Sequence, residues 1–311
     1  MNNTPAQVAS LLLEGDKYLI VTHKSPDGDT IGSATALCGA LRRAGKTAYL
    51  FNNPQIVEKY APYIEGCIAP VGYEYSRAIA VDVASDDMRA RGYEGDFWLC
   101  IDHHPTNPGY AEHNLIRPES AACAMIILQV IKELTGSVTA DEATLLYIGL
   151  TTDTACFRHG NTDPAALRAG AELLELGARS REVIITFFEK SSAARLRFES
   201  ELYSAIRLYL DGKVAAVIVS REMVEKTGVT ENDLEDLSNL VTRVDGPVIG
   251  VTVKELENGE GSKISLRGLH AAEVCSSFGG GGHAVAAGCS IKEPPEKALE
   301  MIINALKEAL K

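Results

Sequence analysis

The chain of 311 residues is long enough for one large hydrophobic core or for two domains of ordinary size. Its formal net charge of −12 argues against long duplex nucleic acid as a partner, because such binding needs a basic surface that neutralises many phosphates. Small anionic substrates remain compatible with the acidic balance, since bound metal ions reverse the sign of the local charge.

In the first half of the chain, short apolar strands alternate with helical patterns. This alternation is typical of an α/β domain with a mainly parallel sheet and helices on both faces. A capping box at 139–142 and the pair Asp163-Pro164 mark the starts of two of the helices. We expect strands at 18–22, 47–51, 78–83 and 97–101, and helices at 31–44, 120–134, from 140 onward and at 164–177.

After Arg181 the pattern changes, and we expect a helical connector followed by a smaller α/β domain. Residues 192–210 are charged and amphipathic without a strand pattern, which favours a connecting helix. Beyond them we expect a strand at 213–220, a helix within 231–244, a hairpin of 247–256 with 263–267 around 257–262, and a helix at 295–310. The predicted organisation is a first domain at 1–187, a linker at 188–204 and a second domain at 205–311, with a cleft between the domains.

Cysteine usage and hydropathy favour a cytoplasmic protein. The 7 cysteines are scattered and form no C-x-x-C motif, which fits a reducing compartment better than a disulfide framework. Charges or helix breakers interrupt every apolar stretch before it reaches the length of a membrane span, so we expect no membrane partner. Residues 1–10 also lack the basic and apolar regions of a signal peptide.

Imidazole and carboxylate side chains follow several of the predicted strands. The carboxyl edge of an open α/β sheet is where such proteins bind ligands. Gly28 permits a sharp turn between two of the carboxylates. Mixed nitrogen and oxygen donors suit Mn²⁺, Fe²⁺ or Zn²⁺ rather than Ca²⁺, and predict metal-assisted hydrolysis. The candidates are His23, Asp27 and Asp29 after the first strand, Asp82 after the apolar run 78–81, Asp102, His103 and His104 after the strand at 97–101, and Asp153 at the end of a helical run.

Each of these residues also has a purely structural interpretation. Asp82 or Asp153, taken alone, would be interpreted as a helix cap, and Asp29 is a good N-cap for the helix at 31–44. The pair His103-His104, taken alone, would be interpreted as partly buried polar residues. We favour the metal site because all the candidates occur together.

This ordered set of motifs resembles the DHH phosphoesterase superfamily, and the resemblance covers nearly the whole chain. The residues that match the four motifs in order are His23, Asp27 and Asp29, then Asp82, then Asp102-His103-His104, then Asp153. Residues 264–267, followed by 278–283, resemble the DHH-associated substrate-binding domain. The two-domain layout and the length are most similar to the bifunctional oligoribonucleases and 3′-phosphoadenosine 5′-phosphate (pAp) phosphatases, also called nanoRNases.

The resemblance implies a site for two divalent metal ions, usually Mn²⁺. The implied ligands are His23 and Asp27 for the first ion, Asp29, His103 and Asp153 for the second, and Asp82 for both. His104 would face the substrate phosphate, where in its protonated form it stabilises or protonates the leaving oxygen. Asp102 would orient the imidazoles from outside the ligand set.

A glycine run at 279–282 predicts a second binding site. Its bare backbone lets N–H groups approach an anion, although a flexible loop is the alternative interpretation. Arg267 offers a planar fork for a phosphate, and the resemblance implies that it helps to hold the terminal nucleotide. Arg158 is a further phosphate candidate, with a solvent-facing loop position as its alternative. The predicted substrate-binding residues are Arg267, Gly280, Gly281, Gly282, His283 and Arg158.

The predicted function is hydrolysis of short oligoribonucleotides or linear dinucleotides to mononucleotides, together with conversion of pAp to AMP. One alternative is a phosphodiesterase for cyclic dinucleotides of the c-di-AMP type, although no sensor or membrane domain is attached here. Another is a non-catalytic nucleotide-binding protein, which the complete ligand set disfavours. An inorganic pyrophosphatase shares the first-domain motifs, but the glycine run and Arg267 favour a nucleotide. Family analogy implies a homodimer.

Overall fold

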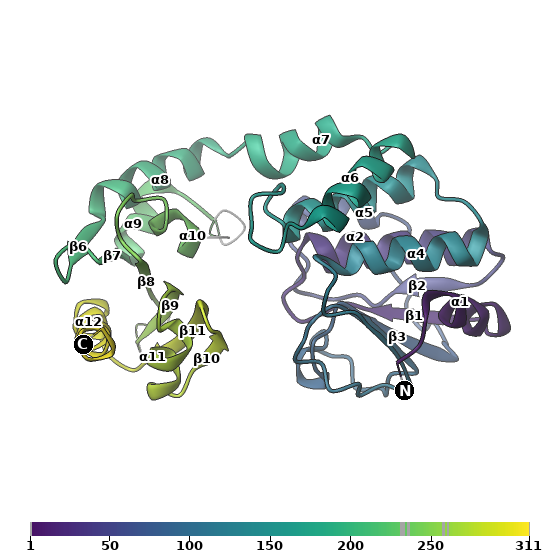
Figure 1. The fold of residues 1–311 in the computed structure, drawn as a ribbon, viewed down its shortest axis with the longest axis horizontal. Helices are drawn as coiled ribbons and strands as arrows, with labels where there is room; N and C mark the ends of the chain where they lie inside the picture. The colour runs from purple at the N-terminus through teal and green to yellow at the C-terminus, as the bar shows by residue number, and fades with distance from the viewer. Residues whose placement is uncertain (1, 231–233, 235–236, 257–258, 260, 311) are drawn as a thin grey trace. The chain divides into compact units, whose positions relative to one another are not determined.

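The computed structural model describes residues 2–230, 234, 237–256, 259 and 261–310, and divides the chain into two units, Met1–Lys190 and Ser191–Lys311. Each unit has its own sheet and its own buried core (Figure 1). None of the helices in the described parts of the chain combines the length and the apolar character that a membrane crossing needs.

The sheet of the first unit has five parallel strands in the order β2-β1-β3-β4-β5. The strand order reverses beside β1, which creates the crevice at the carboxyl edge where open α/β sheets bind ligands. The four expected strands are confirmed, and β5 is an addition. The strands are β1 (Tyr18–Val21), β2 (Ala48–Leu50), β3 (Arg77–Val81), β4 (Leu99–Asp102) and β5 (His113–Ile116).

Long helices cover one face of this sheet (Figure 1). Two expected helix starts are confirmed, because Thr139 forms a capping box and Asp163 caps a helix that begins with proline. The covering helices are α1 (Pro5–Glu14), α2 (Gly28–Arg43), α4 (Cys123–Thr135) and α5 (Ala140–Asp153). The unit also contains η1 (Glu58–Tyr60), α3 (Ala61–Ile64), η2 (Asp86–Met88), α6 (Pro164–Glu175), α7 (Ser180–Ile184) and the π-helix η3 (Ile185–Glu189).

The opposite face of the sheet is covered differently from the expected second helical layer. Its buried side chains pack against loop residues such as Ala90, Tyr93 and Phe97. Met88 of η2 is the helical residue that packs there within the described ranges. The α/β class and the parallel sheet are thus confirmed, while aromatic loop residues do much of the covering on this side.

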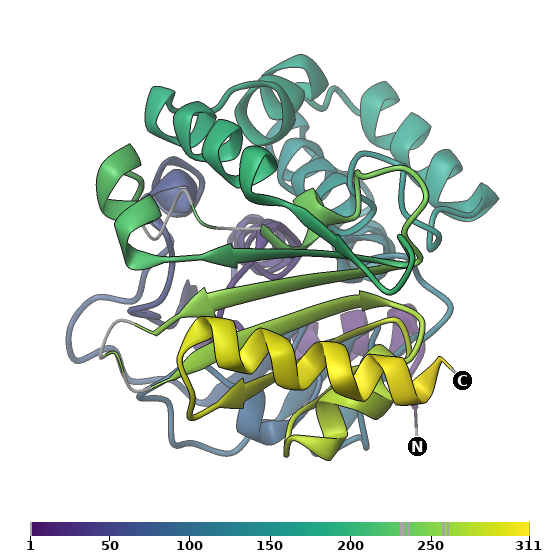
Figure 2. The ribbon, with the colours of Figure 1, turned by 90° about the vertical axis from the view of Figure 1, so that its left-hand side faces the viewer.

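The second unit contains a mixed sheet in the order β10-β11-β9-β8-β7-β6. The expected hairpin is confirmed as the antiparallel pair β8–β9, and α12 packs on the sheet (Figure 2). The strands are β6 (Arg207–Tyr209), β7 (Val214–Val219), β8 (Ile249–Glu255), β9 (Ser262–Gly268), β10 (Gly281–His283) and β11 (Ala286–Ile291). The helices are α8 (Ala193–Ala205), α9 (Arg221–Thr227), α10 (Leu237–Val241), α11 (Ala271–Ser277) and α12 (Pro295–Ala309).

The region expected as one connecting helix is instead a helix followed by a strand. Phe198 and Leu202 of α8 are buried with residues of β7, so α8 packs within the second unit. β6 begins at Arg207, inside the range expected to lack a strand. Parts of two other expected elements, 231–233 and 235–236 in the helix and 257–258 and 260 in the hairpin turn, lie outside the described residues.

Candidate metal centre

The ends of three strands and of two helices bring the predicted ligands together. Most of these side chains follow the carboxyl end of a strand, so short loops deliver them to one edge of the sheet. His23 follows β1 and Asp82 follows β3, while β4 ends at Asp102 and is followed by the two histidines. Asp27 and Asp29 lie at the start of α2, and Asp153 is the last residue of α5.

The first group of ligand atoms contains His23, Asp27 and Asp82. His23 Nε2 lies 3.6 Å from Asp27 Oδ1 and 3.8 Å from Asp82 Oδ2. Asp27 also caps α2, because its Oδ1 accepts hydrogen bonds from the N–H groups of Asp29 and Thr30 at 3.0 and 3.2 Å. The Asp27 carboxylate therefore both caps α2 and faces the imidazole of His23.

The second group contains Asp29, His103 and Asp153. His103 Nδ1 lies 3.1 Å from the carbonyl oxygen of Ser120, which only accepts, so Nδ1 carries the proton. The lone pair of Nε2 then points toward carboxylates, with Asp153 Oδ2 at 3.7 Å and Asp29 Oδ2 at 3.9 Å. A neutral imidazole in this tautomer is ready to bind a cation between these groups.

Asp29 has a structural role that the sequence did not reveal. The interpretation of Asp29 as the cap of its own helix is wrong, since Asp27 holds that position. Asp29 Oδ2 instead accepts from the N–H of Cys123 at 2.6 Å, and Oδ1 accepts from the N–H of Ala124 at 2.9 Å, at the start of α4. Ser33 Oγ donates to Oδ1 as well, at 3.1 Å. Oδ2 keeps a further lone pair for a ligand on the His103 side.

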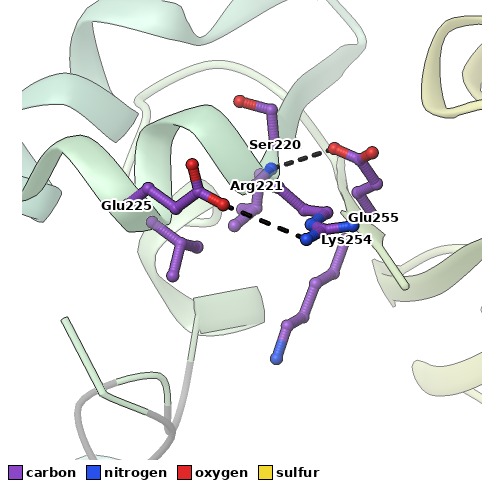
Figure 3. Close-up of a pocket in the computed structure, with 7 residues that line it drawn as sticks. Ser220, Arg221, Glu225, Lys254 and Glu255 are labelled. Atoms are coloured by element: carbon purple, nitrogen blue, oxygen red, sulfur yellow. Dashed lines mark hydrogen bonds and ion pairs between the residues drawn. The ribbon is translucent and has the colours of Figure 1, made fainter. Parts of the chain in front are cut away.

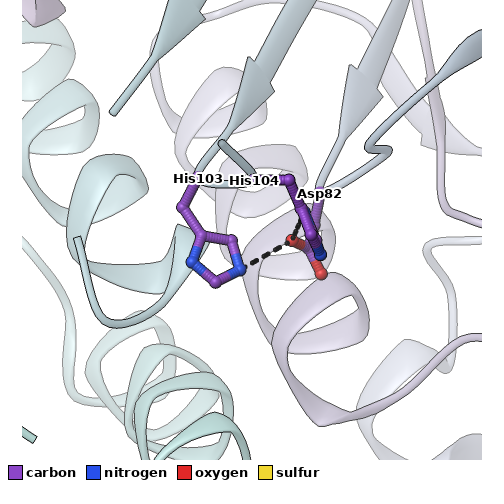
Figure 4. A group of neighbouring side chains, drawn as sticks. All are labelled: Asp82, His103 and His104. Carbon is purple, nitrogen blue, oxygen red and sulfur yellow. Dashed lines mark ion pairs between the residues drawn. The ribbon is translucent and has the colours of Figure 1, made fainter. Parts of the chain in front are cut away.

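Asp82 lies between the two groups and is 2 % exposed. Its Oδ1 is 3.5 Å from His103 Nε2, and this oxygen has no hydrogen-bond partner among the described residues (Figure 4). The backbone of Asp82 is left-handed, with φ 60°, which turns the side chain away from the path of the strand. Burial and the neighbouring charges of Asp29 and Asp27 raise the pKa of Asp82 well above its ordinary value.

The distances between the predicted ligand atoms fit binding to shared divalent ions better than direct hydrogen bonds between these residues. The distances of 3.5–3.9 Å between these nitrogen and oxygen atoms are too long for hydrogen bonds. Two atoms that each bind one ion at about 2.0–2.2 Å lie about 3–4 Å apart. Together with the buried, unpartnered oxygen of Asp82, this spacing shows that the residues present fit a pair of divalent cations.

A hydrogen-bonded shell supports the third motif. Asp102 is fully buried, and its Oδ1 lies 2.8 Å from His104 Nδ1 and accepts from the N–H of His103 at 2.8 Å. Asn107 Nδ2 donates to Asp102 Oδ2 at 2.6 Å and to the carbonyl of Val83 at 3.2 Å. The contact of Asn107 with Asp102 and that of the Ser120 carbonyl with His103 were not predicted from the sequence, because a polar loop residue carries no local mark of a tertiary contact.

Close helix packing sets the positions of the helix-borne ligands. A Cβ at Gly149 of α5 would lie 2.7 Å from Asp29 Oδ1 and 2.8 Å from the Cβ of Ala124. A Cβ at Gly32 of α2 would overlap the carbonyl oxygen of Leu145. The absence of side chains at these positions lets α2 and α5 approach closely, which brings Asp29 and Asp153 to a shared centre.

The predicted substrate residues of the second unit lie on its sheet. Gly281 and Gly282 of the glycine run begin the edge strand β10, and a Cβ at Gly280 or Gly282 would overlap the carbonyl oxygens of β11. Arg267 is half-buried on β9, and the strand register aligns it with Ala286 and, one strand further, with His283. Its Nε donates to Asn239 Oδ1 at 3.4 Å.

Two other features lie outside these groups. Arg158 is exposed, and its Nε donates to the carbonyl of Ala155 at 2.6 Å. A small pocket of about 90 Å³ in the second unit lies beside Arg221 (Figure 3). Glu255 accepts from the N–H of Arg221 at 2.9 Å, and Glu225 lies 4.0 Å from its guanidinium. The carboxylates of Glu255 and Glu225 thus engage the backbone N–H and the guanidinium of Arg221, which would otherwise attract a phosphate.

Comparison with known proteins relates both units to described families. Residues 17–150 match the DHH family N-terminal domain, and residues 211–311 match the DHHA1 domain. A bifunctional oligoribonuclease and PAP phosphatase NrnA from Thermus thermophilus is 34% identical over 305 residues, which cover 96% of this chain and 91% of that protein.

Two solved structures share the fold. An exopolyphosphatase-related protein from Bacteroides fragilis has a TM-score of 0.87 at 21% identity, with 98% of this chain and 96% of that chain covered. RecJ in complex with Mn²⁺ from Thermus thermophilus has a TM-score of 0.56 at 14% identity, with 97% of this chain and 54% of that chain covered. At these identities the likeness concerns the fold alone.

Proposed function

This chain belongs to the DHH family of phosphoesterases, and from that premise we propose that it hydrolyses short oligoribonucleotides or linear dinucleotides to mononucleotides. We propose that it also converts pAp to AMP. The observation that carries the proposal is the position of Asp82, whose two oxygens face two separate His/Asp groups. The named activities of the Thermus thermophilus relative support the choice of substrates.

The proposed cofactor is a pair of Mn²⁺ ions. His23, Asp27 and Asp82 would hold one ion, and a mixed imidazole and carboxylate donor set suits Mn²⁺. Asp29, His103 and Asp153 would hold the other, with Asp82 shared. When bound, two such ions supply positive charge for the phosphoryl transition state and lower the pKa of an attacking water.

His104 is the proposed general acid. Asp102 engages Nδ1 of His104, which leaves Nε2 as the atom that carries a proton to the leaving oxygen. The Asp102 carboxylate orients the ring of His104, and Asn107 fixes that carboxylate by the hydrogen bond at 2.6 Å. The imidazole ring of His103, in contrast, is held by Ser120, which fits a ligand rather than a proton donor.

The second domain is proposed to bind the substrate. Its boundaries in this proposal are 205–311, after a catalytic domain at 1–187 and a linker at 188–204 whose helix α8 packs on the second unit. Arg267 would contact a phosphate of the terminal nucleotide, with Gly280, Gly281, Gly282 and His283 near the base or sugar. Arg158 of the catalytic domain remains a candidate for a further phosphate contact.

A substrate panel tests the proposal. With Mn²⁺, mononucleotide release should be fastest from dinucleotides and short RNAs and should fall as RNA length grows. Phosphate release from pAp should also occur, and a chelator should abolish both reactions. Faster cleavage of a cyclic dinucleotide than of its linear form would support the alternative phosphodiesterase, and tight nucleotide binding without turnover would support a non-catalytic protein.

Assembly and location stay predictions. We propose a homodimer, which light scattering of the purified chain would test. We propose a cytoplasmic location, which fractionation of the producing cells would test.

A further inference from the structure

Two cysteines meet on the far half of α2, away from the metal centre. Cys38 lies nine residues after Asp29 on this helix, which is about 13 Å along the helix axis. Cys38 is buried, and its thiol donates to the carbonyl oxygen of Ala48 at 3.3 Å, beside the thiol of Cys67. Cys67 is half-buried beside β2, since its carbonyl accepts from the N–H of Leu50 at 2.8 Å. The pair thus combines one accessible thiol with one enclosed thiol.

The guanidinium of Arg42 lies beside Cys67, the accessible cysteine of this pair. Its Nη1 lies 3.9 Å from Cys67 Sγ, and its Nε donates to the carbonyl of Ala48 at 2.8 Å. Its Nη2 is buried without a hydrogen-bond partner, and within the described ranges no carboxylate forms an ion pair with this guanidinium. Its other hydrogen bonds in the described parts of the chain go to backbone carbonyl oxygens, of Ala48 and Gly66, so the Cys67 sulfur is a titratable group that this guanidinium contacts.

These contacts favour the thiolate form of Cys67. The contact with Cys38 and the charge of Arg42 outweigh burial and lower the pKa of Cys67 to about 6. The same pairing, with burial, raises the pKa of Cys38, so the shared proton stays on the enclosed sulfur. Tyr73 also lies near this cluster, and burial raises its pKa to about 12, so its phenol is neutral at neutral pH.

We propose that Cys67 and Cys38 form a peroxide-oxidation site, with Cys67 as the attacking thiolate and Cys38 as the thiol that resolves the product into a disulfide. Cys67 Sγ attacks hydrogen peroxide, the O–O bond breaks, and the released hydroxide takes a proton to become water. Cys38 then gives up its proton and attacks Cys67 Sγ, which displaces a second hydroxide as water. Two thiols are oxidised to one disulfide, and one peroxide is reduced to two waters.

The other thiol pair provides an internal comparison. Cys275 and Cys289 also contact each other, but both side chains are buried, at 0% and 6% exposure. Cys156 is half-buried but has no cysteine partner among its described contacts. The chain therefore contains a cysteine pair that is buried from solvent, Cys275 with Cys289, and a half-buried cysteine without a cysteine partner among its described contacts, Cys156.

Peptide mapping of the full-length protein tests the proposal. The reduced protein is treated with one equivalent of hydrogen peroxide, alkylated with N-ethylmaleimide and digested without reductant. We expect a peptide linked through Cys38 and Cys67, two hydrogen masses lighter than its parts and released by dithiothreitol. We expect Cys67 to react at least about tenfold faster than Cys156, because the Arg42 guanidinium beside Cys67 favours its thiolate form.

Two variants separate the roles of the residues. In Cys38→Ala the link should disappear, and Cys67 should instead be captured by dimedone as a sulfenic acid. In Arg42→Met the oxidation of Cys67 should slow markedly, while the control variant Cys275→Ala should keep the wild-type rate and link. Oxidation of Cys67 no faster than Cys156 in the unmodified protein, or a first disulfide between Cys275 and Cys289, would overturn the proposal.

Discussion

Oδ1 of Asp82 lies 3.5 Å from Nε2 of His103, and no described residue gives this buried oxygen a hydrogen bond. A buried carboxylate oxygen without a hydrogen-bond partner destabilises a fold. The position of Asp82 Oδ1 is therefore the one expected of an oxygen that binds a cation. We predict that Asp82→Asn lowers turnover with Mn²⁺ by at least about 100-fold, because even partners outside the ligand shell are worth about 10–100-fold. The same variant should melt at a higher temperature than the metal-free parent.

Asp87→Asn is the matched control for this substitution, because Asp87 is exposed on the nearby helix η2. It should leave both turnover and melting temperature close to those of the parent. Calorimetric titration with Mn²⁺ and thermal melting of the metal-free proteins provide the measurements. Parent-like turnover by Asp82→Asn would contradict the shared-ligand role.

The contact between Asp102 and His104 leads to a prediction about proton transfer. His104→Asn should lower kcat for a dinucleotide by about 10²–10⁴-fold, because the leaving sugar hydroxyl needs a proton. Mn²⁺ binding should be unchanged, since Asp102 holds His104 at Nδ1 through a direct hydrogen bond of 2.8 Å. A p-nitrophenyl ester should be cleaved with little loss, because its leaving group departs without protonation. Equal losses on both substrates would indicate a structural role instead.

Much of the candidate metal centre could be predicted from the sequence, because most of its predicted ligands follow strands. The ends of parallel strands share one sheet edge, so His23, Asp82 and His103 had to lie near one another once the sheet was expected. The role of Asp29 at the start of α4 could not be predicted, since it depends on contacts with residues 94 and 95 positions away. The supports from Asn107 and Ser120 depend on tertiary contacts in the same way.

Two of the strands that were not expected from the sequence, β5 and β10, have weak strand patterns. β5 includes His113 and Asn114, which interrupt the apolar run that marks a buried strand. β10 consists largely of glycine, which has low strand propensity, and is held by its pairing with β11. Helix α1 was also not expected, although the capping box of Thr4 and Gln7 is a local signal for its start.

The crowded carboxylates predict how pH affects the metal-free protein. Burial and mutual repulsion raise the pKa of Asp153 to about 8, and burial also raises the pKa of Asp29. The native state therefore binds more protons than the unfolded state above the ordinary value of 3.8, and the free energy of unfolding falls as pH rises toward 8. His103, whose pKa is raised by Asp29 and Asp153 despite burial, acts in the same direction.

Melting curves of the metal-free protein should thus show a lower melting temperature at about pH 7.5 than at about pH 5.5. Mn²⁺ should restore more stability at the higher pH, because it replaces protons in the site. Asp153→Asn removes one of the titrating groups and should flatten the dependence. A metal-free protein that becomes more stable over this pH range would contradict the assignment.

The bare backbone of Gly149 predicts a sharp difference between two glycine substitutions. Gly149→Ala places a Cβ 2.7 Å from Asp29 Oδ1, so we expect a loss of about 1–3 kcal/mol in the free energy of unfolding and weaker Mn²⁺ binding. Gly39→Ala on α2 has its nearest neighbour at 3.8 Å and should stabilise the helix by up to about 1 kcal/mol. Denaturant unfolding and Mn²⁺ titration measure both effects, and equal behaviour of the two variants would refute the packing argument.

Arg267 leads to a prediction that separates substrate binding from chemistry. Arg267→Lys keeps the charge but loses the planar fork, so we expect KM for a dinucleotide to rise about tenfold with kcat nearly unchanged. Arg207→Lys, on the exposed strand β6 at the opposite end of the same sheet, is the matched control and should behave as the parent does. Hydrolysis of bis-p-nitrophenyl phosphate, which lacks a second nucleotide, should be equal in all three proteins. Because Arg267 lies outside the DHH domain, a fall in kcat on that small ester would mean that the substitution disturbs the fold rather than the recognition of a nucleotide.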